Sequence, residues 1–344
     1  MSAQPGFFDL SDRYEQLSKH NDPLERLNET IDWNIFSPLL KKAFKKERKN
    51  AAGRKPIPRL LMFKVLVLQS LYNLSDAQTE YQIRDRLSFM RFLNLNLEDR
   101  VPDEKTIWAF REQLIIKNTY NKLFRRFETY LTNQGYQAQK GTVVDASIIP
   151  AKIQRNSDDE TAAIKEGCIP EDWVKNPNKV KQKDIDARWT MKDKRSSYGY
   201  KNHIAIDVKH KLIRSYEVTH AARHDSFMLP DLVAAVKGTS RKVYADRAYR
   251  DKKTATWLEK NSYEGKIPYQ RKRGGQLTER QKKFNKTVSS TRIRVEHVFG
   301  FMKQSMKQNL IRSIGIVRAE AKLSLVNLVY NLSRFEQLQR LSCA

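Results

Sequence analysis

Cysteine, glycine and proline are scarce in this sequence. It contains two cysteines, Cys168 and Cys343, with 12 glycines and 11 prolines among 344 residues. Two cysteines cannot build a disulfide framework or a cysteine-based zinc site, and their number agrees with a reducing compartment. The low glycine and proline content excludes collagen-like and low-complexity chains. No apolar run approaches the roughly 18 residues that a membrane span needs, and residues 1–14 lack the pattern of a secretory signal.

Positive charge is present in large excess. The chain has 65 Lys and Arg against 39 Asp and Glu, a formal net charge of +26. Hydrophobic residues make up 40%, enough for packed cores, and the length suggests about two domains. This excess of basic side chains favours a surface that binds phosphates, so nucleic acid is the expected partner. A ribosome-associated or merely basic protein is the alternative.

The first 135 residues are predicted to be helical. Apolar spacing and capping signals predict helices over residues 60–72, 75–87, 102–114 and 120–131, with Ser75 as an N-cap. The first of these follows the basic, proline-marked segment 53–58. Short helices with basic flanks are typical of a helix-turn-helix arrangement, and a generic helical bundle shows the same spacing.

The second half changes to a mixed pattern. Strands are predicted over 141–146, 200–208, 212–219, 241–246 and 265–269, and helices over 227–236, 253–260, from 290 past 303, and 318–338. The segments 200–208 and 212–219 form a hairpin. This order predicts an α/β sheet with covering helices. Residues 152–197 have little periodicity and many cations, which indicates a basic, flexible insertion or a solvated loop.

Three acidic residues have apolar neighbours. Asp145 and Asp246 each end a predicted strand, and Glu296 lies on a predicted helix between Val295 and Val298. A carboxylate in such a place needs a partner or a cation. Carboxylate oxygens are the ligands that Mg²⁺ prefers, and two such ions can activate an attacking hydroxyl and stabilise the leaving one in phosphoryl transfer. Asp207 and Asp225 are competing candidates for the same role.

An ordered set of motifs resembles one family along nearly the whole chain. The motifs are Gly53-Arg54-Lys55-Pro56, Tyr72-Asn73-Leu74-Ser75-Asp76, Pro102-Asp103-Glu104-Lys105-Thr106-Ile107, Gly141-Thr142-Val143-Val144-Asp145-Ala146-Ser147, Asp186-Ala187-Arg188-Trp189, Tyr198-Gly199-Tyr200-Lys201-Asn202-His203, Ala245-Asp246-Arg247-Ala248-Tyr249 and Arg294-Val295-Glu296-His297. The set resembles the DDE transposases of bacterial insertion sequences, of the insertion-sequence-five type. This resemblance implies an α/β RNase H-like catalytic domain over 138–344, with a basic insertion at about 152–197 and a C-terminal helix. It implies an all-α DNA-binding domain over 1–137.

The resemblance also implies roles for single residues. Asp145, Asp246 and Glu296 match the three family acids and would hold two Mg²⁺ ions, with Mn²⁺ as a substitute. The family signature of Tyr, Arg, Glu and Lys is met at Arg292, Glu296 and Lys303, whereas Ser289 stands at the Tyr position. Arg292 and Lys303 would grip DNA phosphates; a local ion pair between Arg292 and Glu296 is the alternative.

Further DNA contacts are predicted at basic and aromatic positions, namely Arg188, Trp189, Lys201, Arg271, Lys272, Arg273, Arg54 and Lys55. Trp189 could stack on a base or anchor the insertion in the core, and the second interpretation is favoured slightly. His203 is as compatible with the core as with a site. His297 is expected to be structural because it points away from Glu296 on a helix.

The expected protein is therefore a transposase that binds the terminal inverted repeats of an insertion sequence. It would cleave double-stranded DNA at the element ends and join the 3′-hydroxyls to a target, as a homodimer or larger assembly on DNA. We expect it in the bacterial cytoplasm at the nucleoid, with no membrane contact. A DNA-binding regulator or inactive remnant, and a metal-dependent nuclease without strand transfer, are the alternatives.

Overall fold

The structure is a computed structural model that describes residues 9–45, 56–192, 194–271 and 275–343. The chain forms two compact units. One contains the residues up to Tyr130 together with those from Leu328 onward, and the other runs Leu131–Asn327. The C-terminal helix α15 (Ile316–Cys343) contributes to both units.

The first unit is helical. Its elements are α1 (Asp9–Lys19), α2 (Pro23–Thr30), the 3₁₀ turn η1 (Trp33–Phe36), α3 (Ser37–Ala43), α4 (Arg59–Tyr72), α5 (Asp76–Asp85), α6 (Leu87–Leu93), α7 (Glu104–Ile116) and α8 (Tyr120–Asn133). The all-α prediction for this region is confirmed. Ser75 caps α5 through a reciprocal capping box with Gln78, as the sequence predicted. The segment predicted as a helix to residue 87 ends at Asp85, and α6 follows it.

An aromatic core holds these helices together. Its rings belong to Trp33, Phe36, Phe63, Phe92 and Phe127. Lys64 of α4 is buried against them, with its ammonium 4.7 Å from the centroid of the Phe92 ring and 2.6 Å from Asn28 Oδ1. Burial lowers the pKa of Lys64 to about 8. The ring faces and the amide oxygen therefore compensate a charge that would otherwise be costly to bury.

The second unit is built on a mixed sheet. Its strands are β1 (Thr142–Pro150), β2 (Arg188–Lys192), β3 (Arg195–Asp207), β4 (Ile213–His220), β5 (Lys242–Tyr244) and β6 (Glu264–Lys266). β3 pairs antiparallel with β1, β2 and β4, while β1, β5 and β6 run parallel. The predicted hairpin is β3 and β4. The strand predicted over 241–246 is shorter than expected, so Asp246 lies just beyond it.

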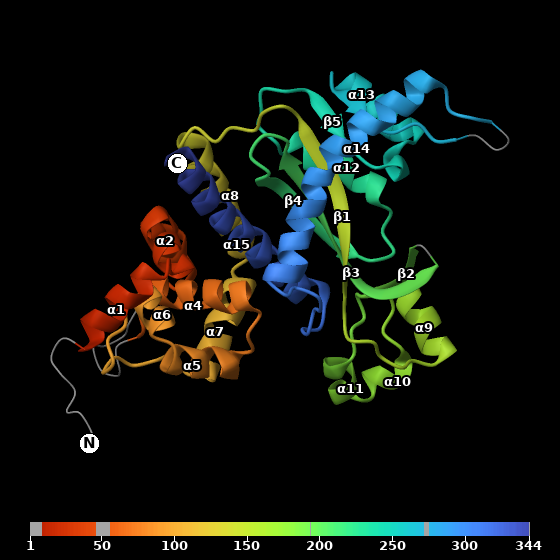
Figure 1. Ribbon diagram of the computed structural model, residues 1–344. Helices are drawn as coiled ribbons and strands as arrows, with labels where there is room; N and C mark the ends of the chain where they lie inside the picture. Colours follow the sequence, from red (N-terminus) through yellow and green to blue (C-terminus); the bar gives the residue numbers. More distant parts are fainter. Residues whose placement is uncertain (1–8, 46–55, 193, 272–274, 344) are drawn as a thin grey trace. The chain divides into compact units, whose positions relative to one another are not determined.

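Helices cover both faces of this sheet. They are α12 (Leu229–Ala234), α13 (Lys252–Lys260) and α14 (Glu279–Gly300), together with the 3₁₀ turns η2 (Asp225–Met228) and η3 (Arg247–Tyr249) and the π-helical turn η4 (Phe301–Ser305). Because side chains alternate along a strand, neighbouring residues of β1 face opposite sides. Val144 packs in the core beneath α12, whereas Asp145 faces α14, which runs across β1 in Figure 1.

The insertion at 152–197 has more structure than its sequence pattern suggests. It contains α9 (Asp158–Lys165), α10 (Glu171–Val174), α11 (Pro177–Gln182) and β2, and it leads into β3. Trp173 is fully buried and donates from Nε1 to Glu160 at 2.6 Å. Trp189 is 49% exposed, so the favoured interpretation of Trp189 as the core anchor was wrong. Trp173 takes that place because its apolar ring packs inside the insertion while its only donor is bonded.

The buried carboxylate of Asp184 fixes the end of the insertion. It accepts a hydrogen bond from Tyr200 Oη at 2.8 Å and from the backbone amide of Ala187 at 3.0 Å. Asp186, two residues later, accepts from the amide of Ile316 at 2.9 Å, the first residue of α15. An anionic group is favourable at a helix N-terminus. The two aspartates therefore tie the insertion to the sheet and to the start of α15.

Candidate active site

Asp145 is held on β1 with one face toward α14. Its side chain is 17% exposed, and Oδ1 accepts from the amide of Ala146 at 2.8 Å. The flanking residues Val143 and Val144 are fully buried, which fixes the strand and therefore the direction of the carboxylate. β1 lies between β3 and β5, so Asp145 sits on a central strand rather than at the edge of the sheet.

Asp246 follows the parallel neighbour strand β5. It is the N-cap of η3, and its Oδ1 accepts from the amide of Arg247 at 2.6 Å. β1 and β5 run parallel, and Val143 of β1 pairs with Tyr244 of β5, so Asp145 and Asp246 each lie two residues beyond this pair. β1 continues to Pro150, so the prediction that Asp145 ends its strand was wrong. Parallel pairing of the two strands therefore brings the two aspartates near each other.

The helix α14 brings three more predicted residues to this place. Arg292 and Glu296 lie one turn apart, and Lys303 follows in η4, where the helix widens into a π turn. The helix begins at Glu279, eleven residues before the predicted start, with a capping box at Thr278. All three residues line the same open cavity as the two aspartates, with a volume of about 830 Å³. Glu296 is exposed to that cavity.

Arg292 joins the two aspartates. Its Nη2 lies 3.1 Å from Asp145 Oδ2, and its Nη1 lies 3.3 Å from Asp246 Oδ1. The guanidinium of Arg292 pairs with these two aspartates and not with Glu296, so the alternative of a local ion pair on the helix was wrong. Burial raises the pKa of Asp145, the guanidinium of Arg292 opposes this rise, and the neighbouring Asp246 adds to it. The site thus keeps two carboxylates close together around one cation.

The donor chemistry of this site fits a divalent cation. Asp145 and Asp246 point at a common position that a positive group already occupies, and Glu296 adds oxygen donors in the same cavity. Among the described residues, no group of three His, Cys, Asp or Glu side chains is arranged closely enough to hold an ion. The guanidinium of Arg292 lies between the two aspartates.

Sequence reasoning missed several residues that line the cavity. Arg195, at the start of β3, is one of them, as are Ser147, Ser197 and Phe299. Arg195 is exposed, and its guanidinium has no hydrogen bond or ion pair among the residues that the structure describes. It lies in the part of the insertion that has no periodicity, so only its charge could have drawn attention to it.

The other predicted DNA contacts differ in how free their side chains are. Arg188 donates to the carbonyls of Ile164, Ile185 and Ala187. Lys201 is buried and bonded to the carbonyl of Arg223 and to Asp225 at 2.8 Å. Arg271 donates from Nε to the carbonyl of Gly275, and Trp189 lies on β2 with its ring 5.4 Å from that of Tyr198. Four further candidates, Arg54, Lys55, Lys272 and Arg273, lie outside the described residues.

The competing acids and the histidines have other partners. Asp207 is fully buried and forms an ion pair with Arg214 at 2.9 Å. Asp225 pairs with Lys201. His203 is fully buried, with Nε2 2.8 Å from Thr219 Oγ1. Burial lowers the pKa of His203 to about 4, although Asp225 opposes this change. His297 is outside the cavity lining, and its Nδ1 lies 3.3 Å from Lys211 Nζ.

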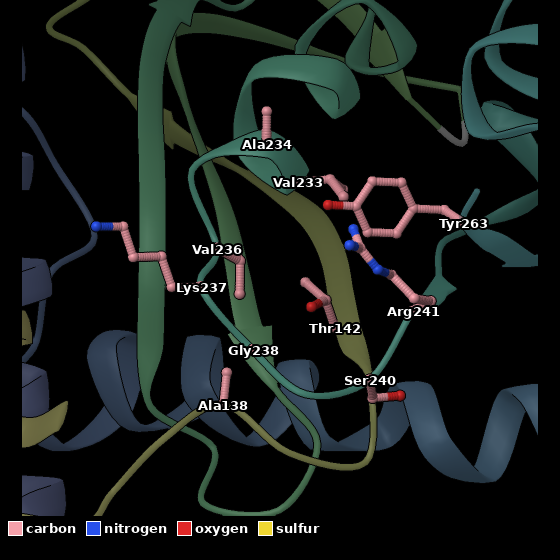
Figure 2. Close-up of a pocket in the computed structure, with 11 residues that line it drawn as sticks. Ala138, Thr142, Val233, Ala234, Val236, Lys237, Gly238, Ser240, Arg241 and Tyr263 are labelled. Atoms are coloured by element: carbon pink, nitrogen blue, oxygen red, sulfur yellow. The ribbon is translucent and has the colours of Figure 1, made fainter. Parts of the chain in front are cut away.

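A second, smaller cavity opens near the start of β1 (Figure 2). Its volume is about 280 Å³, and Thr142, Arg241 and Tyr263 are among its lining residues. Figure 2 shows the Arg241 side chain beside the Tyr263 ring, and the guanidinium lies 5.1 Å from the ring centroid. The lining contains no carboxylate, so this cavity lacks the donors that characterise the site around Asp145.

The strand order and the helices on both faces define an α/β RNase H-like core in the second unit, and the first unit is all-α. The model of the transposase DDE domain family matches residues 136–332, more than half of the chain, and the chain belongs to this family. A second model, described as a transposase domain (DUF772), matches residues 12–113. The resemblance drawn from the sequence motifs is therefore confirmed.

One solved structure is also similar. It is a cryo-EM structure of piggyBac transposase in a synaptic complex with hairpin DNA, with 13% sequence identity and a TM-score of 0.48. The match covers 94% of this chain and 76% of that chain. No helix in the described part of the chain combines the length and apolarity of a membrane span.

Proposed function

We propose that this transposase binds the terminal inverted repeats of an insertion sequence, cuts DNA at the element ends and joins the 3′-hydroxyls to target DNA. The observation that carries the proposal is the convergence of Asp145, Asp246 and Glu296, from two parallel strands and a covering helix, on one cavity. The open shape of this cavity suits a polymer backbone rather than an enclosed small molecule. The net charge of +26 would attract such a polyanion.

Divalent metal ions are used in this family, and the three carboxylates are the residues that would hold two Mg²⁺ or Mn²⁺ here. Such ions would lower the pKa of an attacking water and stabilise the leaving oxygen. Asp145 and Asp246 would supply oxygen ligands from the rigid sheet. Glu296 would supply its oxygens from α14, which contacts β1 and in which Val295 and Val298 are fully buried.

The cations that line the cavity would bind the scissile strand. Lys303 and Arg195 belong to η4 and β3, and both line the cavity that contains the acids. A guanidinium can bind a phosphate through two parallel hydrogen bonds, whereas an ammonium acts as a point charge. We propose Arg195 as an additional phosphate contact beside Arg292 and Lys303. Trp189, Arg271 and the basic residues outside the described ranges would contact more distant DNA.

The helical unit would recognise the end sequence, and we expect a homodimer or larger assembly on DNA because transposition pairs two ends. The test is incubation of the full chain with a DNA fragment that carries the element's own flanks and a supercoiled target. Insertion products that need Mg²⁺ and vanish with chelator support the proposal. Cut ends without insertion would identify a nuclease, and mobility shifts without any cleavage would identify a DNA-binding regulator.

A further inference from the structure

Arg292 provides the positive charge between the first two acids of the site. One guanidinium nitrogen lies 3.1 Å from Asp145 and the other 3.3 Å from Asp246, and the Arg292 side chain is only 14% exposed. Two carboxylates this close repel each other unless a cation separates them. The guanidinium therefore does electrostatically what a bound metal ion would do at the same position.

The contacts that hold Arg292 are weak ones for an ion pair of this kind. Charge-assisted N–H···O bonds are usually about 2.7–2.9 Å, and both contacts are longer. Each carboxylate receives one nitrogen, so neither pair is bidentate. The Nε of Arg292 is buried and has no hydrogen-bond partner in the described part of the chain. Asp246, with 41% of its side chain exposed, opens directly onto the cavity.

A divalent ion and the guanidinium cannot share this position. An ion that bridges Asp145 and Asp246 would lie within a few ångströms of a fixed positive charge, and the two cations would repel each other strongly in a half-buried site. The same cavity that admits DNA gives the Arg292 side chain space to move into.

We propose that Arg292 is an internal competitor for the metal. Its guanidinium occupies the position between Asp145 and Asp246 and so keeps cations from the solvent out of it. A divalent ion enters by displacing the Arg292 side chain toward the cavity. There it becomes available to a DNA phosphate. This inference rests on the proposed function. The new element is that Arg292 weakens metal binding in the DNA-free protein, although it binds a DNA phosphate once the metal has entered.

The test is a titration of the full chain with Mn²⁺ in the absence of DNA. Electron paramagnetic resonance measures the concentration of free Mn²⁺ and therefore the affinity. Arg292→Gln removes the competing charge and should bind Mn²⁺ about tenfold more tightly than the wild type, the factor that one charge-assisted hydrogen bond represents. Arg292→Lys keeps a charge without the fork and should fall between them. Arg280→Gln removes a charge from an exposed position on the same helix and should leave the affinity unchanged.

A second measurement follows the side chain itself. Phenylglyoxal modifies accessible arginines, and mass spectrometry can quantify its addition at Arg292. Saturating Mn²⁺ should increase modification at Arg292 in the wild type and leave it unchanged in Asp145→Asn. This readout does not depend on how well the Arg292 variants fold.

The outcomes distinguish the competitor role of Arg292 from the metal site itself. Unchanged or weaker Mn²⁺ binding in Arg292→Gln, with binding that still requires Asp145, would overturn the competitor role and leave the proposed function intact. Protection of Arg292 from phenylglyoxal by Mn²⁺ would overturn it as well. If neither the wild type nor Arg292→Gln binds Mn²⁺, the metal site itself, and the competitor role with it, would be rejected.

Discussion

Arg292 Nη2 lies 3.1 Å from Asp145 Oδ2, although 147 positions of sequence separate the two residues. The contact joins the covering helix α14 to the central strand β1. It places Glu296, one helical turn further on, in the cavity that both aspartates line. This ion pair therefore links the helix that carries Glu296 to the strand that carries Asp145.

Loss of the strand carboxylate should abolish cleavage without abolishing DNA binding. Asp145→Asn keeps the shape of the side chain but removes the negative charge that a divalent ion needs. We expect end cleavage to fall by about 10³-fold, the scale on which a preorganised electrostatic group acts, while mobility shifts persist. Asp231→Asn, at an exposed position of α12, is the matched control and should cut normally. Normal cutting by Asp145→Asn would remove Asp145 from the site.

Arg195 should contribute one phosphate contact. Arg195→Ala should weaken DNA binding by about tenfold, as expected for loss of one charge-assisted contact. The slope of log K against log salt concentration should decrease in magnitude by about 0.9. Fluorescence anisotropy at several salt concentrations measures both. Arg195→Lys should keep the slope and lose part of the affinity. A salt slope that stays unchanged in Arg195→Ala would show that Arg195 does not touch DNA.

The buried His203 should make stability sensitive to acid. Its pKa of about 4 in the folded protein lies below the ordinary value of 6.5, so the unfolded chain binds the proton more readily. As the pH falls from 6.5 to 4, the wild type should lose about 3 kcal/mol of unfolding free energy from this residue, and little more below pH 4.

The variant His203→Gln isolates this effect. Gln can still bond to Thr219 but cannot take up a proton, so its denaturation midpoint should change less than that of the wild type between pH 6.5 and 4. Urea denaturation at half-unit pH intervals measures the difference. If the denaturation midpoints of the two proteins changed in parallel with pH, His203 would have the same protonation in the folded and the unfolded chain, and this prediction would be wrong.

Asp184 should carry much of the stability of the insertion. Its buried carboxylate accepts from Tyr200 and from backbone amides, and Asp184→Ala would leave these donors without a partner. We expect a loss of about 3 kcal/mol in the unfolding free energy of the second unit. Asp172→Ala, at an exposed position of α10, should change it by less than about 0.5 kcal/mol. Equal stability of the two variants would contradict the anchoring role.

The sequence was sufficient to predict much of the sheet. Apolar, β-branched residues before Asp145 and Asp246 identified the buried strands β1 and β5, although β1 extends beyond Asp145 to Pro150. The hairpin and the N-cap Ser75 were predictable for the same reason, since each depends on residues close together in the chain. The catalytic role of the two acids stays a prediction.

The interactions that complete the site were not predictable in this way. Helical spacing offered Glu296 as the partner of Arg292, whereas the actual partners are Asp145 on β1 and Asp246 just after β5, both far away in sequence. Trp173 and Trp189 lie in the same insertion, and only tertiary packing decides that the first is buried. Arg195 lies where periodicity gives no signal, so its place beside the acids depends entirely on how β3 pairs.

The most direct test of the central claim is to map the metal by iron-mediated cleavage of the polypeptide. Fe²⁺ that replaces Mg²⁺ generates hydroxyl radicals, which cut the backbone next to the bound ion. We expect breaks near residues 145, 246 and 296, all suppressed by excess Mg²⁺ and by Asp145→Asn. Breaks confined to other segments, or breaks at these positions that neither treatment reduces, would contradict it.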